Sequence, residues 1–137
     1  MSDQSARKQS VVPYLVYENS TQALDYLCKA FGFKEITRIP REDGTLMHAE
    51  VEHEGNIIML GTPVDENGKV KKLRLPANAT QPSSTMCYVS DIPKHYARAK
   101  AAGARITMEL QERSHGEQMY AATDTEDHAW YFSTYHG

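Results

Sequence analysis

Two stretches of this chain, residues 47–62 (MHAEVEHEGNIIMLGT) and residues 119–134 (MYAATDTEDHAWYFST), match each other without a gap at a shift of 72 residues. Their apolar positions coincide, and each stretch has the pattern of two short strands joined by a tight turn. An internal repeat of this kind indicates a duplicated supersecondary unit. The identical pairs are Met47/Met119, Ala49/Ala121, Glu54/Glu126 and Thr62/Thr134.

The segments before each hairpin repeat in the same order. Residues 11–17 are β-branched and aromatic and predict a strand. A helix follows, with Asn19 or Ser20 as its N-cap and Gly32 as its stop. In the second half, the corresponding strand is expected over 85–89, with Asp91, Pro93 and Gly103 marking the helix. The remaining strands are expected over 33–39, 46–52, 56–62, 104–110, 118–124 and 128–134.

The repeated order is strand, helix and three strands, which predicts an α+β fold of two βαβββ modules. We expect a polar tail over residues 1–10 and a single domain over 11–135. Its modules would span 11–62 and 84–135, joined by a loop over 63–83 that is rich in Pro, Gly, Asn and Ser.

Composition and charge exclude several classes of partner. The net charge is -3, so no strongly basic surface is available to bind nucleic acid. No apolar run approaches the ~20 residues of a membrane span, and the polar start is not a signal peptide. Cys28 and Cys87 lie within apolar patterns and are interpreted as buried thiols in a reducing compartment. These features predict a cytoplasmic protein.

Four motifs resemble one superfamily. Residues 30–33 (AFGF) and 101–104 (AAGA) end the two helices, and residues 47–51 (MHAEV) contain an H-A-E strand. Residues 124–132 (DTEDHAWYF) are similar to a D-P-x-G-H-x-W-x-F ending, with Thr125 in place of Pro and Asp127 in place of Gly. On these residues the chain resembles the vicinal oxygen chelate superfamily, and within it an uncharacterised bacterial glyoxalase-like subgroup. The superfamily includes glyoxalase I, extradiol dioxygenases, fosfomycin-resistance enzymes and bleomycin-binding proteins.

The resemblance implies a cupped, incomplete barrel that encloses a cavity. It also implies metal-ligand positions at Pro13 and Met59 in one module and at Thr85 and Tyr131 in the other. None of these residues is His, Glu or Asp, the donors that such metals need. We therefore expect no metal and no cofactor, and no glyoxalase I or dioxygenase activity.

His48 and Glu50 are the candidate chemical pair. Side chains alternate along a strand, so Met47, Ala49 and Val51 are expected to pack on a helix while His48 and Glu50 share the opposite face. The two side chains could form an acid/base pair or part of a non-standard metal site. A solvated strand face or a structural hydrogen bond remains the alternative.

Further side chains are expected to line the same cavity. Trp130 is predicted to lie in the core, whereas Arg113 and His115 lie either at the mouth of the cavity or in an exposed turn. The predicted ligand-binding residues are Tyr17, His48, Glu50, Met59, Tyr120 and Tyr131.

The sequence thus predicts a metal-free protein that binds a small molecule of unknown identity. The alternatives are a divergent lyase or isomerase that uses His48 and Glu50, and an interaction module without a cavity. A single pair of modules leaves strand edges exposed, so a homodimer is expected.

Overall fold

The computed structural model describes residues 9–76 and 79–134. Residues 1–8 of the expected tail lie outside the described residues. Gln9 is held at the first sheet, since its side chain accepts from the amide of Ile57 (2.6 Å) and donates to the carbonyl of the same residue (3.0 Å). Neither helix of the described residues is long and apolar enough to cross a membrane.

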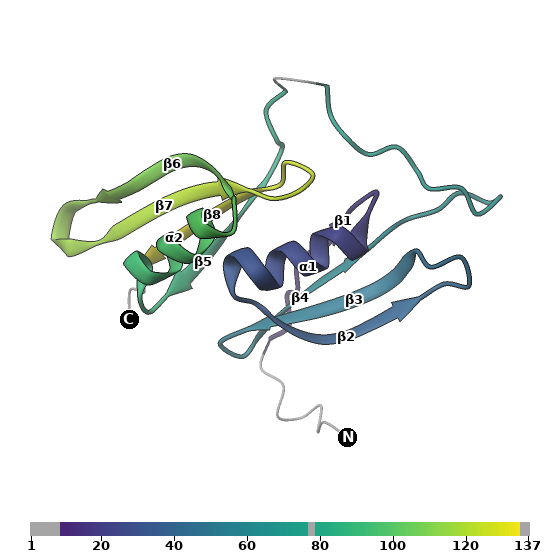
Figure 1. Cartoon of the computed structure of the whole chain (residues 1–137), viewed down its shortest axis with the longest axis horizontal. Helices are drawn as coiled ribbons and strands as arrows, with labels where there is room; N and C mark the ends of the chain where they lie inside the picture. Colours follow the sequence, from purple (N-terminus) through teal and green to yellow (C-terminus); the bar gives the residue numbers. More distant parts are fainter. Residues whose placement is uncertain (1–8, 77–78, 135–137) are drawn as a thin grey trace. The chain divides into compact units, whose positions relative to one another are not determined.

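The chain divides into two compact units, each of which contains one four-stranded sheet. The described part of the first unit covers residues 9–24 and 33–73. Its strands are β1 (Tyr14–Val16), β2 (Lys34–Pro40), β3 (Leu46–His53) and β4 (Asn56–Gly61). They lie in the order β1-β4-β3-β2, with β1 parallel to β4 and the other neighbours antiparallel (Figure 1).

The described part of the second unit covers residues 25–32 and 74–134. Its strands lie in the order β5-β8-β7-β6, again with one parallel pair, β5 and β8, and α2 packs on β6, β7 and β8. The elements are β5 (Ser84–Val89), α2 (Ile92–Ala101), β6 (Arg105–Glu112), a short 3-10 helix η2 (Ser114–Gly116), β7 (Gln118–Thr123) and β8 (Ala129–Thr134).

The parallel pairs confirm the expected repeat. Tyr14 lies opposite Met59 in the first sheet, and Met86 lies opposite Tyr131 in the second, so both strands follow the shift of 72 residues. The α+β class and the two βαβββ modules are therefore confirmed.

The middle of each module follows a shift of 71 residues instead. Ala49 pairs with Leu60 in the first sheet, whereas Tyr120 pairs with Phe132 in the second. The prediction that residues 47–62 and 119–134 correspond without a gap is therefore wrong. The second module is one residue shorter before its helix stop and regains that residue in the turn before β8. Its turn is Thr125–Asp127, whereas the first hairpin closes with only Glu54 and Gly55.

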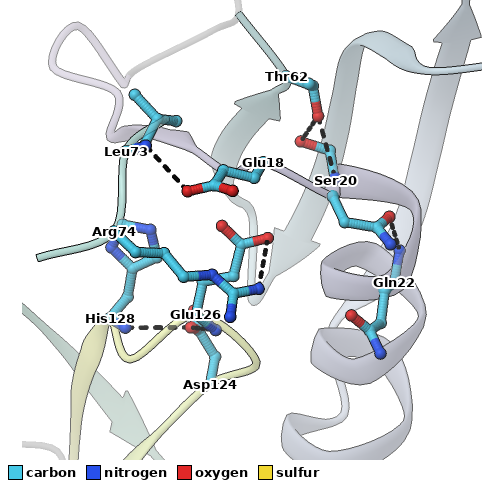
Figure 2. A network of polar contacts seen from close by, with 10 residues as sticks. Glu18, Ser20, Gln22, Thr62, Leu73, Arg74, Asp124, Glu126 and His128 are labelled. Atoms are coloured by element: carbon cyan, nitrogen blue, oxygen red, sulfur yellow. Dashed lines mark hydrogen bonds and ion pairs between the residues drawn. The ribbon is translucent and has the colours of Figure 1, made fainter. Parts of the chain in front are cut away.

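Asp124 organises this longer turn. Its Oδ1 accepts from the amides of Glu126 and His128, at 3.1 Å each, and its Oδ2 accepts from Nε1 of Trp130 at 3.0 Å. Figure 2 shows the Asp124–His128 bond and the nearby pair of Arg74 and the buried Glu126, 3.8 Å apart. The D-x-x-x-H-x-W pattern thus has a structural role, because it closes the hairpin and satisfies a buried indole N–H.

Helix α1 (Ser20–Phe31) begins and ends as the sequence predicts. The side chain of Asn19 accepts from the amide of Gln22 (3.1 Å), which identifies Asn19 as the N-cap. Gly32 ends the helix with a φ of 74°. Within the second unit, Arg98 donates to the carbonyls of Lys29 and Cys28, which satisfies acceptors of the last turn.

Helix α2 has the predicted Asp91 cap, which accepts from the amide of Lys94 at 3.1 Å. The aromatic core of the second unit lies between the end of α1 and the sheet. Phe31, Trp130 and Phe132 are buried there, as predicted for Trp130.

Candidate functional site

The first sheet has one buried face and one open face. Ala49 and Val51 of β3 are fully buried, and Ile58 and Leu60 of β4 lie on the same side. The intervening side chains of β3 point to the other side, which we call the open face of the first sheet. His48 and Glu50 lie on this face, as predicted.

Cross-strand register extends the open face over all four strands. Met59 lies opposite both Tyr14 and Glu50, and Glu50 lies opposite Thr37, so these four residues form one row across the sheet. Val16 and Ile39 flank the row and are about as exposed as surface residues, at 39% and 42%. The open face therefore combines polar groups with accessible apolar surface.

A chain of polar contacts runs over this face. His48 Nε2 lies 2.9 Å from Oε2 of Glu50. His48 Nδ1 lies 3.4 Å from the hydroxyl of Tyr14, with the two ring centroids 5.7 Å apart. The side chains of His48 and Glu50 are only 22% and 19% exposed, whereas Tyr14 is 51% exposed. Glu50 thus orients a half-buried imidazole whose second nitrogen is covered by an accessible phenol.

Gly61 makes room for this arrangement. A Cβ atom at Gly61 would lie 2.9 Å from the hydroxyl of Tyr14 and 2.6 Å from the carbonyl oxygen of Met47. A larger residue would therefore displace the phenol from His48. Sequence reasoning did not identify either Tyr14 or Gly61. The available signal was the parity of the first strand, because Tyr14 and not Pro13 lies beside Met59.

Met47 does not pack in the core as predicted. Its side chain is 48% exposed, because the pairing of β2 with β3 is irregular between Ile39 and Pro40. His48 pairs with Ile39 and Leu46 pairs with Pro40, which leaves Met47 in a bulge. Leu46, only 2% exposed, is buried instead.

Tyr17 and Tyr120 lie away from the open faces. Tyr17 is fully buried and by alternation falls on the side of Leu15. Tyr120 is fully buried on the α2 side of the second sheet, where its hydroxyl lies 2.6 Å from Nδ1 of His95 and burial strongly raises its pKa. The structural equivalent of His48 in the second module is Met119, so the predicted pairing of His48 with Tyr120 is wrong. Neither tyrosine therefore contributes to an open face.

Tyr131 lies where the sequence predicts, on the face of β8 opposite Trp130 and Phe132. It pairs with Met86 of β5 and Ala121 of β7. Met86 and Tyr88, both on this face by alternation, are 46% and 43% exposed. The open face of the second sheet is therefore lined by thioether and phenol groups, with an alanine at the position equivalent to Glu50.

The turn after β6 contains the two residues with an open interpretation. Arg113 is exposed and precedes the 3-10 helix Ser114–Gly116. The side chain of His115 lies outside the described residues. A role of either residue in binding stays a prediction.

Residues 11–132 match the Glyoxalase/Bleomycin resistance protein/Dioxygenase superfamily. This chain belongs to that superfamily. The match covers both modules, which agrees with the resemblance that the sequence motifs carry.

Individual relatives support the family without naming an activity. An uncharacterised protein of Mycobacterium tuberculosis is 29% identical over 118 residues, or 86% of this chain and 69% of that protein. The crystal structure of TioX from Micromonospora sp. ML1 is similar with a TM-score of 0.72 and 29% identity, over 94% of this chain and 98% of that one. The fosfomycin resistance protein FosX from Mesorhizobium loti gives a TM-score of 0.65 at 9% identity, over 94% and 93% of the two chains.

The register corrects the metal-ligand positions that the superfamily resemblance implies. Thr85 pairs with Trp130, whose side is buried, and the residues beside Met59 and Tyr131 are Tyr14 and Met86 instead of Pro13 and Thr85. Phenol and thioether groups do not fit the hard or borderline divalent ions of this chemistry. Within residues 9–76 and 79–134, no group of three or more His, Cys, Asp or Glu side chains is placed to hold a metal ion.

Proposed function

We propose that this chain binds a small molecule on the open face of its first sheet. The observation that carries the proposal is the contact of His48 with Glu50 at 2.9 Å, beside the accessible ring of Tyr14. A half-buried imidazole held by a carboxylate offers one directional polar contact, and Met59, Val16 and Ile39 offer apolar surface around it. A few placed polar groups within an apolar surround are typical of small-molecule sites.

The proposed binding needs no metal. The superfamily's implied ligand positions hold Tyr14, Met59, Met86 and Tyr131, whose side chains are poor ligands for such ions. A neighbouring structure, FosX from Listeria monocytogenes, contains Mn(II) and sulfate, but at 11% identity that likeness shows the fold alone. Metal analysis of purified protein is expected to give well below one equivalent of any transition metal.

Thermal-shift screening tests the proposal. We expect at least one compound of a library of small aromatic molecules and antibiotics to raise the melting temperature of the wild-type protein. The shift is expected to shrink in His48→Ala and to persist in Met119→Ala, which changes the repeat-equivalent position of the second sheet. A library without a single stabilising compound, or a shift that His48→Ala leaves intact, contradicts binding at this face.

Tyr131 has a separate test, because it lies on the second sheet. The sequence predicts that it contacts ligand, and Met86 beside it adds accessible apolar surface. A compound that stabilises the wild type less strongly in Tyr131→Ala, with an unchanged effect in Tyr88→Ala, would assign Tyr131 to ligand binding.

A second candidate is a lyase or isomerase that transfers a proton through His48. The 2.9 Å contact favours it, because a carboxylate that orients an imidazole is a common acid/base arrangement. Any activity found in the wild-type protein must then be lost in His48→Ala. Activity retained in that variant rejects this candidate and leaves the binding proposal unaffected.

We also propose that the chain is a homodimer. Each sheet is open, with β1 and β2 at the edges of the first and β5 and β6 at the edges of the second. Exposed edges are commonly covered, and a two-fold dimer is the usual solution for identical chains. Sedimentation at micromolar concentration is expected to give about twice the chain mass of 15.4 kDa, and a species at the chain mass itself rejects the dimer.

A further inference from the structure

We propose that the ligand of the first sheet is a neutral or cationic molecule that presents an O–H or N–H donor to Nδ1 of His48. This inference rests on the proposed function and names the class of compound that the site accepts. It follows from three features of the open face: the tautomer of His48, the charge around it, and the weak contact of Tyr14.

The tautomer of His48 is determined by its partner. The carboxylate of Glu50 can only accept a hydrogen bond, so Nε2, 2.9 Å from its oxygen, must carry the proton. In the neutral ring Nδ1 is then an acceptor. The group that contacts it is the hydroxyl of Tyr14, which donates. A ligand that replaces Tyr14 at this nitrogen must also bring a donor.

Tyr14 is a replaceable partner. Its hydroxyl is 3.4 Å from Nδ1, at the long end of the hydrogen-bond range, and the residue is 51% exposed. Glu50 is closer and less exposed, so the Glu50–His48 pair is the fixed part of the site. A ligand with a well-aligned donor can gain more from Nδ1 than Tyr14 loses to water.

The charges on the open face disfavour anions. Cross-strand register places Glu52 opposite Lys34, so these two opposite charges are neighbours. Glu50 lies opposite the neutral Thr37, and its negative charge is not balanced while His48 is neutral. A carboxylate or phosphonate at Nδ1 would face this charge and would offer no proton.

The apolar surround favours a flat, apolar body on the ligand. Ile39 lies directly opposite His48, and Val16 lies on the same face at the edge strand. Both are partly exposed, as is the ring of Tyr14. An aromatic ring with one donor at its edge can cover these side chains and reach Nδ1 together.

The first experiment needs no ligand. Two-bond proton–nitrogen NMR spectra at about pH 8, where an ordinary histidine is mainly neutral, should show His48 with the proton on Nε2. The His48 signal is identified by its loss in His48→Gln. Glu50→Ala should shift the ring toward a mixture of tautomers, and Glu52→Ala, on the same strand and face, should not. A His48 proton on Nδ1 in the wild-type protein overturns the inference.

The second experiment uses 2-naphthol, 2-methoxynaphthalene and 2-naphthoate as probes at the same pH. These compounds share a ring system and differ in the donor and the charge. We expect 2-naphthol to bind about tenfold more tightly than 2-methoxynaphthalene, as one good hydrogen bond provides, and 2-naphthoate to bind most weakly. In Tyr14→Phe the affinity for 2-naphthol should rise about two- to threefold, because the competing hydroxyl is gone.

The outcomes separate this inference from the proposed function. If 2-naphthol and 2-methoxynaphthalene bind equally, or if 2-naphthoate binds best, the ligand class is wrong while binding at this face stands. If none of the three binds but other library compounds shift the melting temperature through His48, the ligand class is again rejected alone. If no compound of any kind acts through His48, the proposed function fails, and this ligand class fails with it.

Discussion

The two sheets have the same strand order and the same parallel register, but their open faces differ. Tyr14, His48 and Glu50 of the first sheet correspond in position to Met86, Met119 and Ala121 of the second. The first face therefore has a chain of polar contacts, and the second has thioethers and a methyl group at the same places. The duplicated backbone fixes where side chains point, and substitution at three positions gives only one copy a directional polar site.

The two hairpins differ in a second way. Glu54 and Gly55 close the first with backbone geometry alone, at φ values of 49° and 86°. The second needs one more residue and is held by the carboxylate of Asp124. The following predictions test this comparison, in order of expected effect.

The largest effect is expected for Asp124→Ala. This change removes the acceptor of two backbone amides and of the buried Trp130 indole N–H. Leaving such donors unsatisfied should lower the free energy of unfolding by about 3 kcal/mol, measured by urea denaturation. His53 is the structural equivalent in the first hairpin, and His53→Ala should cost about 1 kcal/mol or less. Equal costs for the two variants would show that the hairpins are held in the same way.

Much of this fold was predictable because local signals agreed with each other. Asn19 and Asp91 were identified as caps from residue type alone, and both accept the expected backbone amide. Gly32 and Gly103 were identified as helix stops, and both have the positive φ that favours glycine there. The alternation of β3 also placed His48 and Glu50 on one face.

The misplaced residues depended on a register that the sequence does not encode locally. The identities Met47/Met119 and Ala49/Ala121 favoured a shift of 72, although pairing in the sheets gives 71 for these strands. One residue of offset moves a side chain to the other face, so Tyr120 was placed with the ligand-binding residues when it is in the core. The same offset of one residue pointed to Pro13 and hid Tyr14.

The second prediction concerns the buried Tyr120, which has no phenol counterpart at Ala49 of the first module. Burial raises the pKa of Tyr120 above its ordinary value, and desolvation also raises the pKa of Tyr26. The folded protein holds these protons more tightly, so the associated stability is complete below about pH 10 and is lost as the pH rises further. One such group reduces the free energy of unfolding by about 1.4 kcal/mol per pH unit in that range.

Urea denaturation between about pH 9 and pH 11 measures this dependence. Tyr120→Phe removes one titrating group and should make the alkaline slope shallower by that amount, in addition to any constant loss from the missing contact with His95. An unchanged slope would mean that Tyr120 does not control the alkaline range.

The third prediction exchanges the turn residues. Gly55 has a φ of 86°, and a Cβ atom added there would have no other atom within 4 Å, so Gly55→Ala should cost about 1 kcal/mol through backbone strain alone. Asp127 has a φ of 68° at the position where the related pattern has Gly. Asp127→Gly should therefore stabilise by about 0.5 kcal/mol. Thermal melting compares both variants with the wild type, and destabilisation by Asp127→Gly would indicate that the Arg105 contact outweighs the strain.

The smallest effect is expected at Met47, which the pattern of β3 places in the core and the bulge places outside. Its side chain is 48% exposed, whereas Val51 on the same strand is fully buried. Met47→Gln should change the free energy of unfolding by less than about 0.5 kcal/mol, as for other surface substitutions. Val51→Ala, which opens a cavity in the buried face, should cost about 2 kcal/mol. Urea denaturation of the two variants decides between the alternation and the bulge: a cost for Met47→Gln as large as that for Val51→Ala would return Met47 to the core and would remove the bulge between Ile39 and Pro40.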